Sequence, residues 1–151
     1  MIKGKASKAI IGMVFLIGNF GTTGMVQAHE GATGIVLERM ESFLQSRGQM
    51  KQMRGALQAG DLAAVANISA KMQIWADKMD AYFPAGSDKK PSEAAPSIWT
   101  DPEGFAKAIT DYQTAVSALN KAALSGDAKA TKAAFGAVGG TCKSCHQSYR
   151  K

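Results

Sequence analysis

The five residues from Cys142 to His146 are the part of this chain whose types and spacing most clearly allow chemistry. They read Cys-Lys-Ser-Cys-His. In a helix, residues three and four apart share one face, so both thiols and the imidazole would point the same way. Two thiols can bond to the two vinyl groups of one porphyrin, and the imidazole can then reach its iron. C-x-x-C-H is the attachment sequence for c-type haem. The motif predicts one covalent haem, bound by Cys142 and Cys145 with His146 as an iron ligand.

Other uses of paired cysteines fit this sequence less well. A zinc site needs four ligands, usually from a second Cys or His pair. This chain has two cysteines and two histidines in all, and the second histidine, His29, is far from the motif. A thioredoxin-like C-x-x-C lies near a βαβ pattern, and no strand pattern appears here. A disulfide between Cys142 and Cys145 would close a very small loop inside a helix.

The first 28 residues have the features of a secretory signal peptide. Three lysines and no acid come before an apolar run at positions 9–17, and Val26-Gln27-Ala28 fits a small-residue cleavage site. We therefore expect residues 1–28 to be removed and residues 29–151 to form the mature chain. The apolar run is too short for a membrane span of ~20 residues, so we expect no membrane segment in the mature form. Because c-type haem is attached outside the cytoplasm, the predicted location is the periplasm.

The charge and length of the mature chain limit the possible functions. Removing three lysines and no acid lowers the formal net charge from +6 to +3. No basic stripe with interleaved aromatic residues remains, so nucleic-acid binding is not expected. About 123 residues remain, which is the length of one domain.

Four helical segments are predicted to position the motif. Apolar residues recur at helical spacing over residues 34–59, 62–82, 102–124 and 127–149. Gly60 and Asp61 are a typical stop and N-cap, and Asp101 before Pro102 is a typical helix start. Residues 88–97 form one long irregular stretch, which we expect to wrap over another element. The sequence therefore predicts an all-α protein, an antiparallel four-helix bundle with haem between facing helices.

Gly139 and Gly140 precede the motif inside the fourth helix. Glycine lowers helix stability, so a second use is expected for them. They allow close approach of another helix or of the ring edge, or they produce a local kink.

The order of segments resembles cytochrome c′, a family within the class II cytochromes c. The features that carry the resemblance are the Phe83-Pro84-Ala85-Gly86 loop, Ile98-Trp99, two Gly-Asp turns and a haem motif in the last helix. The resemblance implies a periplasmic haem protein with His146 as proximal ligand and a distal face built by the first helix. Members of the family often form homodimers through the first two helices, so a homodimer is a possible expectation here. Small residues in the second helix would permit close approach of a partner, or are ordinary helix formers (Ala63, Ala64, Ala66 and Ala70).

The resemblance suggests which residues form the distal face. In the family pattern an arginine is followed four residues later by the distal residue, and Arg39 and Phe43 match that pattern. Phe43 cannot ligate iron, so it predicts five-coordinate, high-spin iron. The alternative is Met40, whose thioether could be a sixth ligand in a low-spin Met/His site. Methionine is also a common core residue.

Three further residues have two possible roles each. Arg39 by itself would be a solvated helix residue, whereas the resemblance implies that it pairs with a haem propionate. The resemblance implies that Trp99 covers the haem edge; the other possible role is to anchor the long loop. The resemblance implies that Arg150 lies beside the proximal pocket. Its other possible role is to stabilise the C-terminus of the last helix, where a positive charge is favourable.

Three functions remain open on the sequence. The first is a small-gas-binding haem protein that takes nitric oxide or carbon monoxide, as Phe43 suggests. The second is an electron carrier with an unknown redox partner, as Met40 suggests. The third is a haem binder with a structural or stress-related role. No second histidine, paired carboxylate or activated nucleophile faces the predicted pocket, so we do not expect an enzyme.

Overall fold

The computed structural model describes residues 31–151; the predicted signal peptide and cleavage site lie outside them. The elements are α1 (Gly34–Ala59), α2 (Leu62–Ala76), the 3₁₀ helix η1 (Met79–Tyr82), α3 (Ser97–Thr100), α4 (Pro102–Leu124) and α5 (Ala128–Tyr149). Within residues 31–151, a single isolated bridge between Ala94 and Arg150 is the only β-type pairing. The predicted all-α fold is confirmed. None of these helices is long and apolar enough to cross a lipid bilayer.

The helix ends follow the signals in the sequence. Gly60 ends α1 in the left-handed conformation, with a φ of 73°. Asp61, Asp101 and Asp127 each accept a hydrogen bond from the backbone N–H three residues later, at 2.8, 3.1 and 2.8 Å. These aspartates satisfy N–H groups that the first helical turn leaves unpaired.

The second helix ends earlier than predicted. The prediction extended it to Tyr82, but α2 ends at Ala76, and η1 follows after a short turn. Side chains three residues apart in a 3₁₀ helix lie above one another, so Met79 and Tyr82 lie on one side of the turn. Met79 is buried in the core, and Tyr82 packs edge-on against Trp75 at 5.0 Å between ring centroids. These contacts favour the tighter turn.

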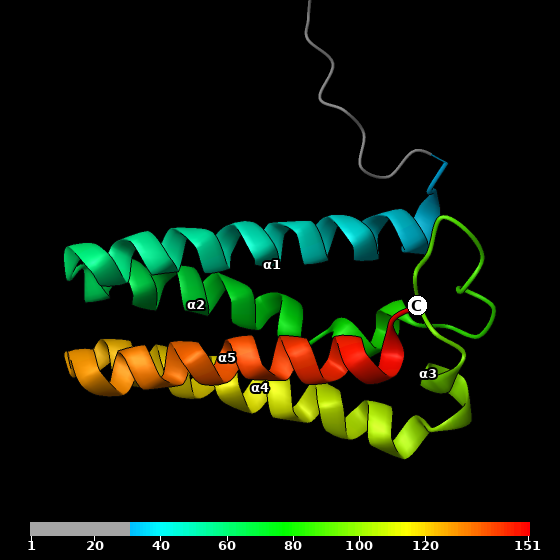
Figure 1. The fold of residues 1–151 in the computed structure, drawn as a ribbon. Helices are drawn as coiled ribbons and strands as arrows, with labels where there is room; N and C mark the ends of the chain where they lie inside the picture. The colour runs from blue at the N-terminus through cyan, green and yellow to red at the C-terminus, as the bar shows by residue number, and fades with distance from the viewer. Residues whose placement is uncertain (1–30) are drawn as a thin grey trace, which may run out of the picture.

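The four long helices form a bundle in which three neighbouring pairs pack closely. α1 packs on α2, α2 on α4, and α4 on α5 (Figure 1). The side between α5 and α1 is not closely packed. Fully buried side chains fill the interior, chiefly Met53, Val65, Met72, Val116, Leu119 and Val138. α1 and α5 therefore contribute to one core without packing closely on each other.

A loop that we call the strap (Ser87–Ser97) lies over one end of the bundle. It binds the end of α5 through Ala95 N to Tyr149 O at 3.0 Å and Lys151 N to Glu93 O at 2.8 Å. The Ser97 hydroxyl also donates to the Ser148 carbonyl at 2.6 Å. The strap thus fixes the end of the helix that carries the C-x-x-C-H motif, as the prediction of a wrapping loop requires.

Candidate functional site

The C-x-x-C-H motif lies in the last two turns of α5. Cys142 and Cys145 are half-buried and pack against the core, whereas His146 is exposed. Burial raises the pKa of both thiols, and for Cys145 the nearby Cys142 raises it further. Burial and the positive charge of Arg150 lower the pKa of His146, although Glu93 acts in the opposite direction. The neutral imidazole is the form that ligates iron, and the lowered pKa favours it.

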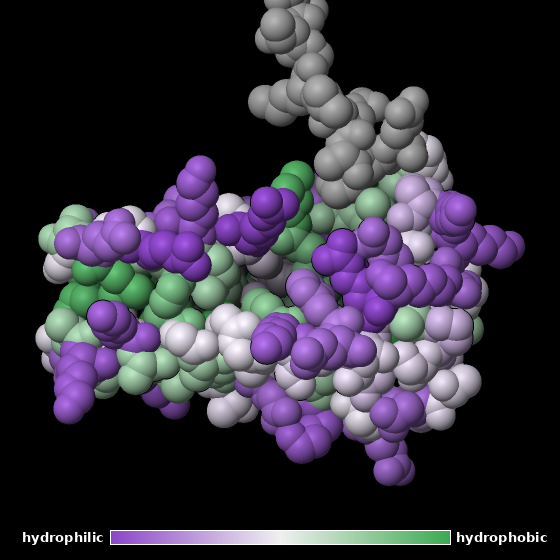
Figure 2. Space-filling model, viewed as in Figure 1, coloured by the Kyte–Doolittle hydropathy of each residue, from purple (hydrophilic) through white to green (hydrophobic). Residues whose placement is uncertain are grey.

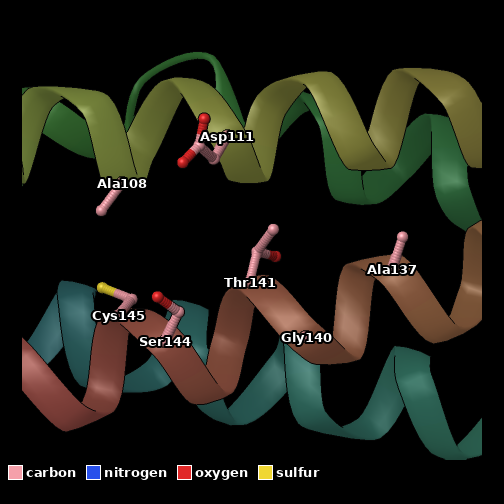
Figure 3. Close-up of a pocket in the computed structure, with 7 residues that line it drawn as sticks. All are labelled: Ala108, Asp111, Ala137, Gly140, Thr141, Ser144 and Cys145. Carbon is pink, nitrogen blue, oxygen red and sulfur yellow. The ribbon is translucent and has the colours of Figure 1, made fainter.

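A groove of about 240 Å³ lies beside Cys145, between α4 and α5. In Figure 3 the sulfur of Cys145 points across this groove toward Ala108 on α4. The lining side chains are small or absent at Ala137 and Gly140. The two helices therefore leave space next to one of the two thiols.

The two glycines before the motif face open space. α5 runs through Gly139 and Gly140 without interruption. A Cβ atom built at either position meets no other part of residues 31–151 within 4 Å. Close approach of another helix is therefore not the reason for these glycines. Approach of a ring edge stays a prediction.

The loosely packed side between α1 and α5 fits an inserted apolar group. Figure 2 shows apolar residues between the polar ones that cover α1 and α5. Phe43 on α1 is 37% exposed, unusually open for a phenylalanine with several aromatic neighbours. Half-buried thiols on α5 and an open phenylalanine on α1 fit a haem held between these two helices.

Phe43 is held between two other aromatic rings. Its ring meets Trp75 of α2 edge to face, with centroids 5.4 Å apart and planes at 87°. On another side it meets Phe83, at 6.4 Å and 58°. Phe83 in turn packs on Phe105 of α4 at 4.9 Å. The residue predicted to cover the distal face is therefore anchored on α1 and supported by α2 and the following loop.

Arg39 is buried, although its sequence neighbours by themselves suggest a solvent-exposed residue on a helix. It is 3% exposed. Nη1 donates to the Tyr82 carbonyl at 2.8 Å and the Ser87 hydroxyl at 2.9 Å, and Nη2 to the Ser87 carbonyl at 2.7 Å and the Ser92 hydroxyl at 2.8 Å. The guanidinium also lies 4.4 Å from the ring centroid of Phe83. Arg39 thus attaches α1 to the strap.

The other predicted arginine, Arg150, pairs with the strap as well. Its Nε donates to Glu93 Oε2 at 2.6 Å, and its Nη2 forms an ion pair with the same oxygen. Both side chains are about half exposed, so the pair adds little stability by itself. The positive charge of Arg150 is one of the causes that lower the pKa of His146, after burial of the imidazole.

The remaining predicted residues have less specific surroundings. Met40 is half-buried on α1, so its role as a sixth ligand stays a prediction. Trp99 is half-buried, and its Nε1 donates to the Phe83 carbonyl at 3.1 Å. That bond supports the loop-anchor role, and contact with a haem edge stays a prediction.

Sequence reasoning missed Trp75, Glu93 and Tyr112. In the sequence Trp75 is one of several apolar residues at helical spacing in the second helix, and Glu93 lies in a loop without a recognisable pattern. Burial is the main cause that raises the pKa of Tyr112 to about 12; the hydrogen bond with Ser46 acts in the opposite direction, and Cys142 raises the pKa further. Tyr112 thus lies near α1 and the haem motif, and no feature of the sequence shows this.

Comparisons with known proteins agree with this geometry. Residues 34–150 match the family model described as Cytochrome C'. Cytochrome c′ from Allochromatium vinosum is 33% identical over 108 residues, which cover 68% of this chain and 69% of that protein. Matches to some other curated relatives span only about half of their length.

Two solved structures show the same fold. One is a ferrous variant of cytochrome c′ from Alcaligenes xylosoxidans with bound NO; it has a TM-score of 0.71 and 27% identity, and the match covers 78% of this chain and 93% of that chain. The other is a cytochrome c′ with ligand-controlled dimer dissociation, with a TM-score of 0.72, 27% identity, and coverage of 77% and 93%. By its sequence, its bundle and its haem motif, the chain belongs to the cytochrome c′ family of haem proteins.

Proposed function

We propose that this chain is a periplasmic protein with one covalent haem, which leaves one face of the iron free for nitric oxide or carbon monoxide, transfers electrons, or does both. The observation that carries the proposal is the placement of Phe43. Its side chain has no ligating atom, it matches the distal residue of the family pattern, and its ring packs against Trp75 and Phe83. The haem would supply an iron that takes a diatomic gas or one electron.

Cys142 and Cys145 would hold the haem from α5. Each thiol adds its S–H across one vinyl group, which forms a carbon–sulfur bond without loss or gain of electrons. Their half-buried position against the core keeps the ring edge close to the helix. His146 would then ligate the iron through a ring nitrogen, as its lowered pKa favours.

Arg39 would bind a haem propionate in addition to the strap. The buried guanidinium has four neutral oxygen acceptors and, among residues 31–151, no carboxylate within ion-pair distance. A buried charge is costly without a counter-ion. The four bonds leave Nε–H as a further donor, and a propionate would provide both its acceptor and the missing negative charge.

Phe43 would exclude water and large ligands from the distal face. A gas molecule can enter only when the ring moves aside, so small ligands are admitted slowly and larger ones are rejected. Arg150, held by Glu93, would contribute a positive charge near His146 on the opposite face. The NO-bound relative supports gas binding for this chain.

The distal proposal can be tested with three variants in the haem-loaded protein. Wild-type protein is expected to show a high-spin absorption spectrum and slow carbon monoxide binding. Phe43→Ala should speed binding markedly. Met40→Ala should leave the spin state unchanged. Met50→Ala, which alters another half-buried methionine of α1, is the matched control.

The second candidate is a low-spin electron carrier with Met40 as sixth ligand, favoured by the position of Met40 one turn before Phe43. It predicts the reverse pattern. The wild-type spectrum would be low-spin, Met40→Ala would make it high-spin, and Phe43→Ala would change little. That pattern would overturn the gas-binding proposal.

We do not propose an enzyme, and we expect the protein to form homodimers. The roles proposed above for the side chains around the motif are binding, orientation and exclusion, and none of them is a catalytic step. The relative with ligand-controlled dimer dissociation supports the dimer.

A further inference from the structure

Phe43 is held by a second aromatic residue that itself has little freedom to move. Trp75 is 5% exposed, and it meets the ring of Phe43 edge to face at 5.4 Å. On another side Trp75 packs against Tyr82, with centroids 5.0 Å apart and planes at 74°. Tyr82 is covered in turn by Lys78, whose Nζ lies 5.4 Å from the ring centroid. Motion of Phe43 toward α2 therefore requires displacement of a packed stack.

The other neighbour of Phe43 is also supported. Phe83 has the guanidinium of Arg39 4.4 Å from its ring centroid and the ring of Phe105 at 4.9 Å. The contact of Phe43 with Phe83 is the longer and more tilted one, at 6.4 Å and 58°. The edge-to-face contact with Trp75 has the geometry that aromatic pairs prefer. Trp75 is thus the stronger restraint on Phe43.

We infer that Trp75 is a positioning residue for gas binding: its indole ring holds Phe43 over the distal face and sets the rate at which small ligands enter. This inference rests on the proposed function, because it takes Phe43 as the distal residue. Trp75 itself need not touch the haem or the gas. Its effect comes from the contact energy that is lost when Phe43 moves aside.

The inference can be tested by a substitution of Trp75 that removes the ring contact without breaking a hydrogen bond of the indole N–H. Trp75 Nε1 is buried and has no hydrogen-bond partner in the described part of the chain. Replacing Trp75 with leucine therefore breaks no hydrogen bond seen in the structure. The change removes the aromatic contact and leaves an apolar side chain in the core.

The experiment measures carbon monoxide association with the ferrous haem protein in wild type, Trp75→Leu and Phe43→Ala. An aromatic pair is worth roughly 0.5–1.5 kcal/mol, so Trp75→Leu should speed association by about two- to tenfold with an unchanged ferric spectrum. In the Phe43→Ala background, Trp75→Leu should add no further acceleration. Ring flipping of Phe43, measured by NMR with labelled phenylalanine, should also become faster in Trp75→Leu.

Phe105→Leu is the matched control, because it also removes a buried aromatic ring of the cluster but has no ring contact with Phe43. It should leave the association rate unchanged. Equal acceleration in Trp75→Leu and Phe105→Leu would mean general loosening and would overturn the inference. If Phe43→Ala speeds association and Trp75→Leu does not, the inference alone fails. If Phe43→Ala has no effect, the distal assignment in the proposed function fails, and the role of Trp75 fails with it.

Discussion

Arg39 carries a positive charge into the interior, and four oxygen atoms of η1 and the strap depend on it. Two of these acceptors are backbone carbonyls, of Tyr82 and Ser87, and two are serine hydroxyls. A methionine of similar length would fill the space but leave the acceptors without donors. Each buried polar group that is left without a hydrogen bond costs roughly 1–3 kcal/mol. Because several acceptors lose their donor at once, these costs add up.

We predict that Arg39→Met lowers the free energy of unfolding by at least about 3 kcal/mol, which urea titration of the haem-loaded protein can measure. Arg47→Met is the control, because Arg47 is exposed on the same helix. The control should change stability by no more than about 0.5 kcal/mol. Similar effects of the two substitutions would contradict the structural role of Arg39.

The covalent link to haem can be tested at the two thiols. We predict that acid–acetone extraction leaves the colour with the wild-type protein and removes it from a Cys142→Ala, Cys145→Ala double variant. Ser144→Ala alters an exposed residue between the two cysteines and should keep the colour with the protein. Extraction of haem from the wild type would contradict the prediction, because a thioether bond does not dissociate under these conditions.

The residues of the haem motif could be predicted because their chemistry is local. Five consecutive residues contain both thiols and the imidazole, and one helix brings them to a common region. The surroundings of Arg39 could not be predicted in the same way. Its partners lie 43 to 53 positions later in the chain, in segments with no regular pattern. Burial of a charged residue by such a loop leaves no periodic signal in the sequence.

At the scale of elements, the start of α4 contains a close approach to the end of α5. The Tyr149 hydroxyl donates to Asp101 Oδ2 at 2.7 Å, while Asp101 Oδ1 caps α4. A Cβ atom at Gly104 would collide with the Asp101 carboxylate and would lie 2.5 Å from the Tyr149 hydroxyl oxygen. A larger residue at this position therefore requires the Asp101 or Tyr149 side chain to shift.

We predict that Gly104→Ala destabilises the protein although alanine is the better helix former. The added methyl group has to displace the cap or break the bond from Tyr149, and loss of an N-cap alone costs about 1 kcal/mol. Gly55→Ala is the control, because Gly55 lies inside α1 with nothing within 4 Å of its Cβ position. That change should stabilise by about 0.5–1 kcal/mol. Thermal unfolding should shift in opposite directions in the two variants, and a shift in one direction for both would refute the argument.

The difference between local signals and distant partners also explains how well each element could be predicted. α1 occupies the predicted range, α4 begins directly after the predicted helix start at Asp101, and α5 begins one residue after its predicted start, because glycine, aspartate and proline act within one turn. The predicted end of the second helix was wrong, because the 3₁₀ turn η1 depends on packing of Tyr82 against Trp75. The short helix α3 packs on α4 and α5, and the strap depends on contacts with α1 and α5. Helix ends set by their own residues were therefore predicted closely, whereas the strap was predicted only as an irregular wrapping loop, without its partners.

At the scale of the whole molecule, the outer face of α2 has features of a subunit interface. Ala63, Asn67, Ala70 and Ile74 are all exposed and lie at spacings of three and four residues, so they form one stripe. Ile74 is 66% exposed, which is high for a large apolar side chain. One of the alanines first assigned to the interface, Ala66, does not belong to it, since it is buried inside the subunit at 5% exposure.

A homodimer with two-fold symmetry would place this stripe of one subunit against the same stripe of its partner. Each substitution then occurs twice in the interface. Ile74→Glu removes two apolar side chains and introduces two like charges at close range. We therefore predict that wild-type protein sediments as a dimer at micromolar concentration and that Ile74→Glu sediments as a monomer. Leu124→Glu is the control: Leu124 is 71% exposed at the end of α4, outside the stripe, and this variant should stay dimeric. A monomeric wild type, or an Ile74→Glu variant that still dimerises, would exclude this face of α2 as the interface.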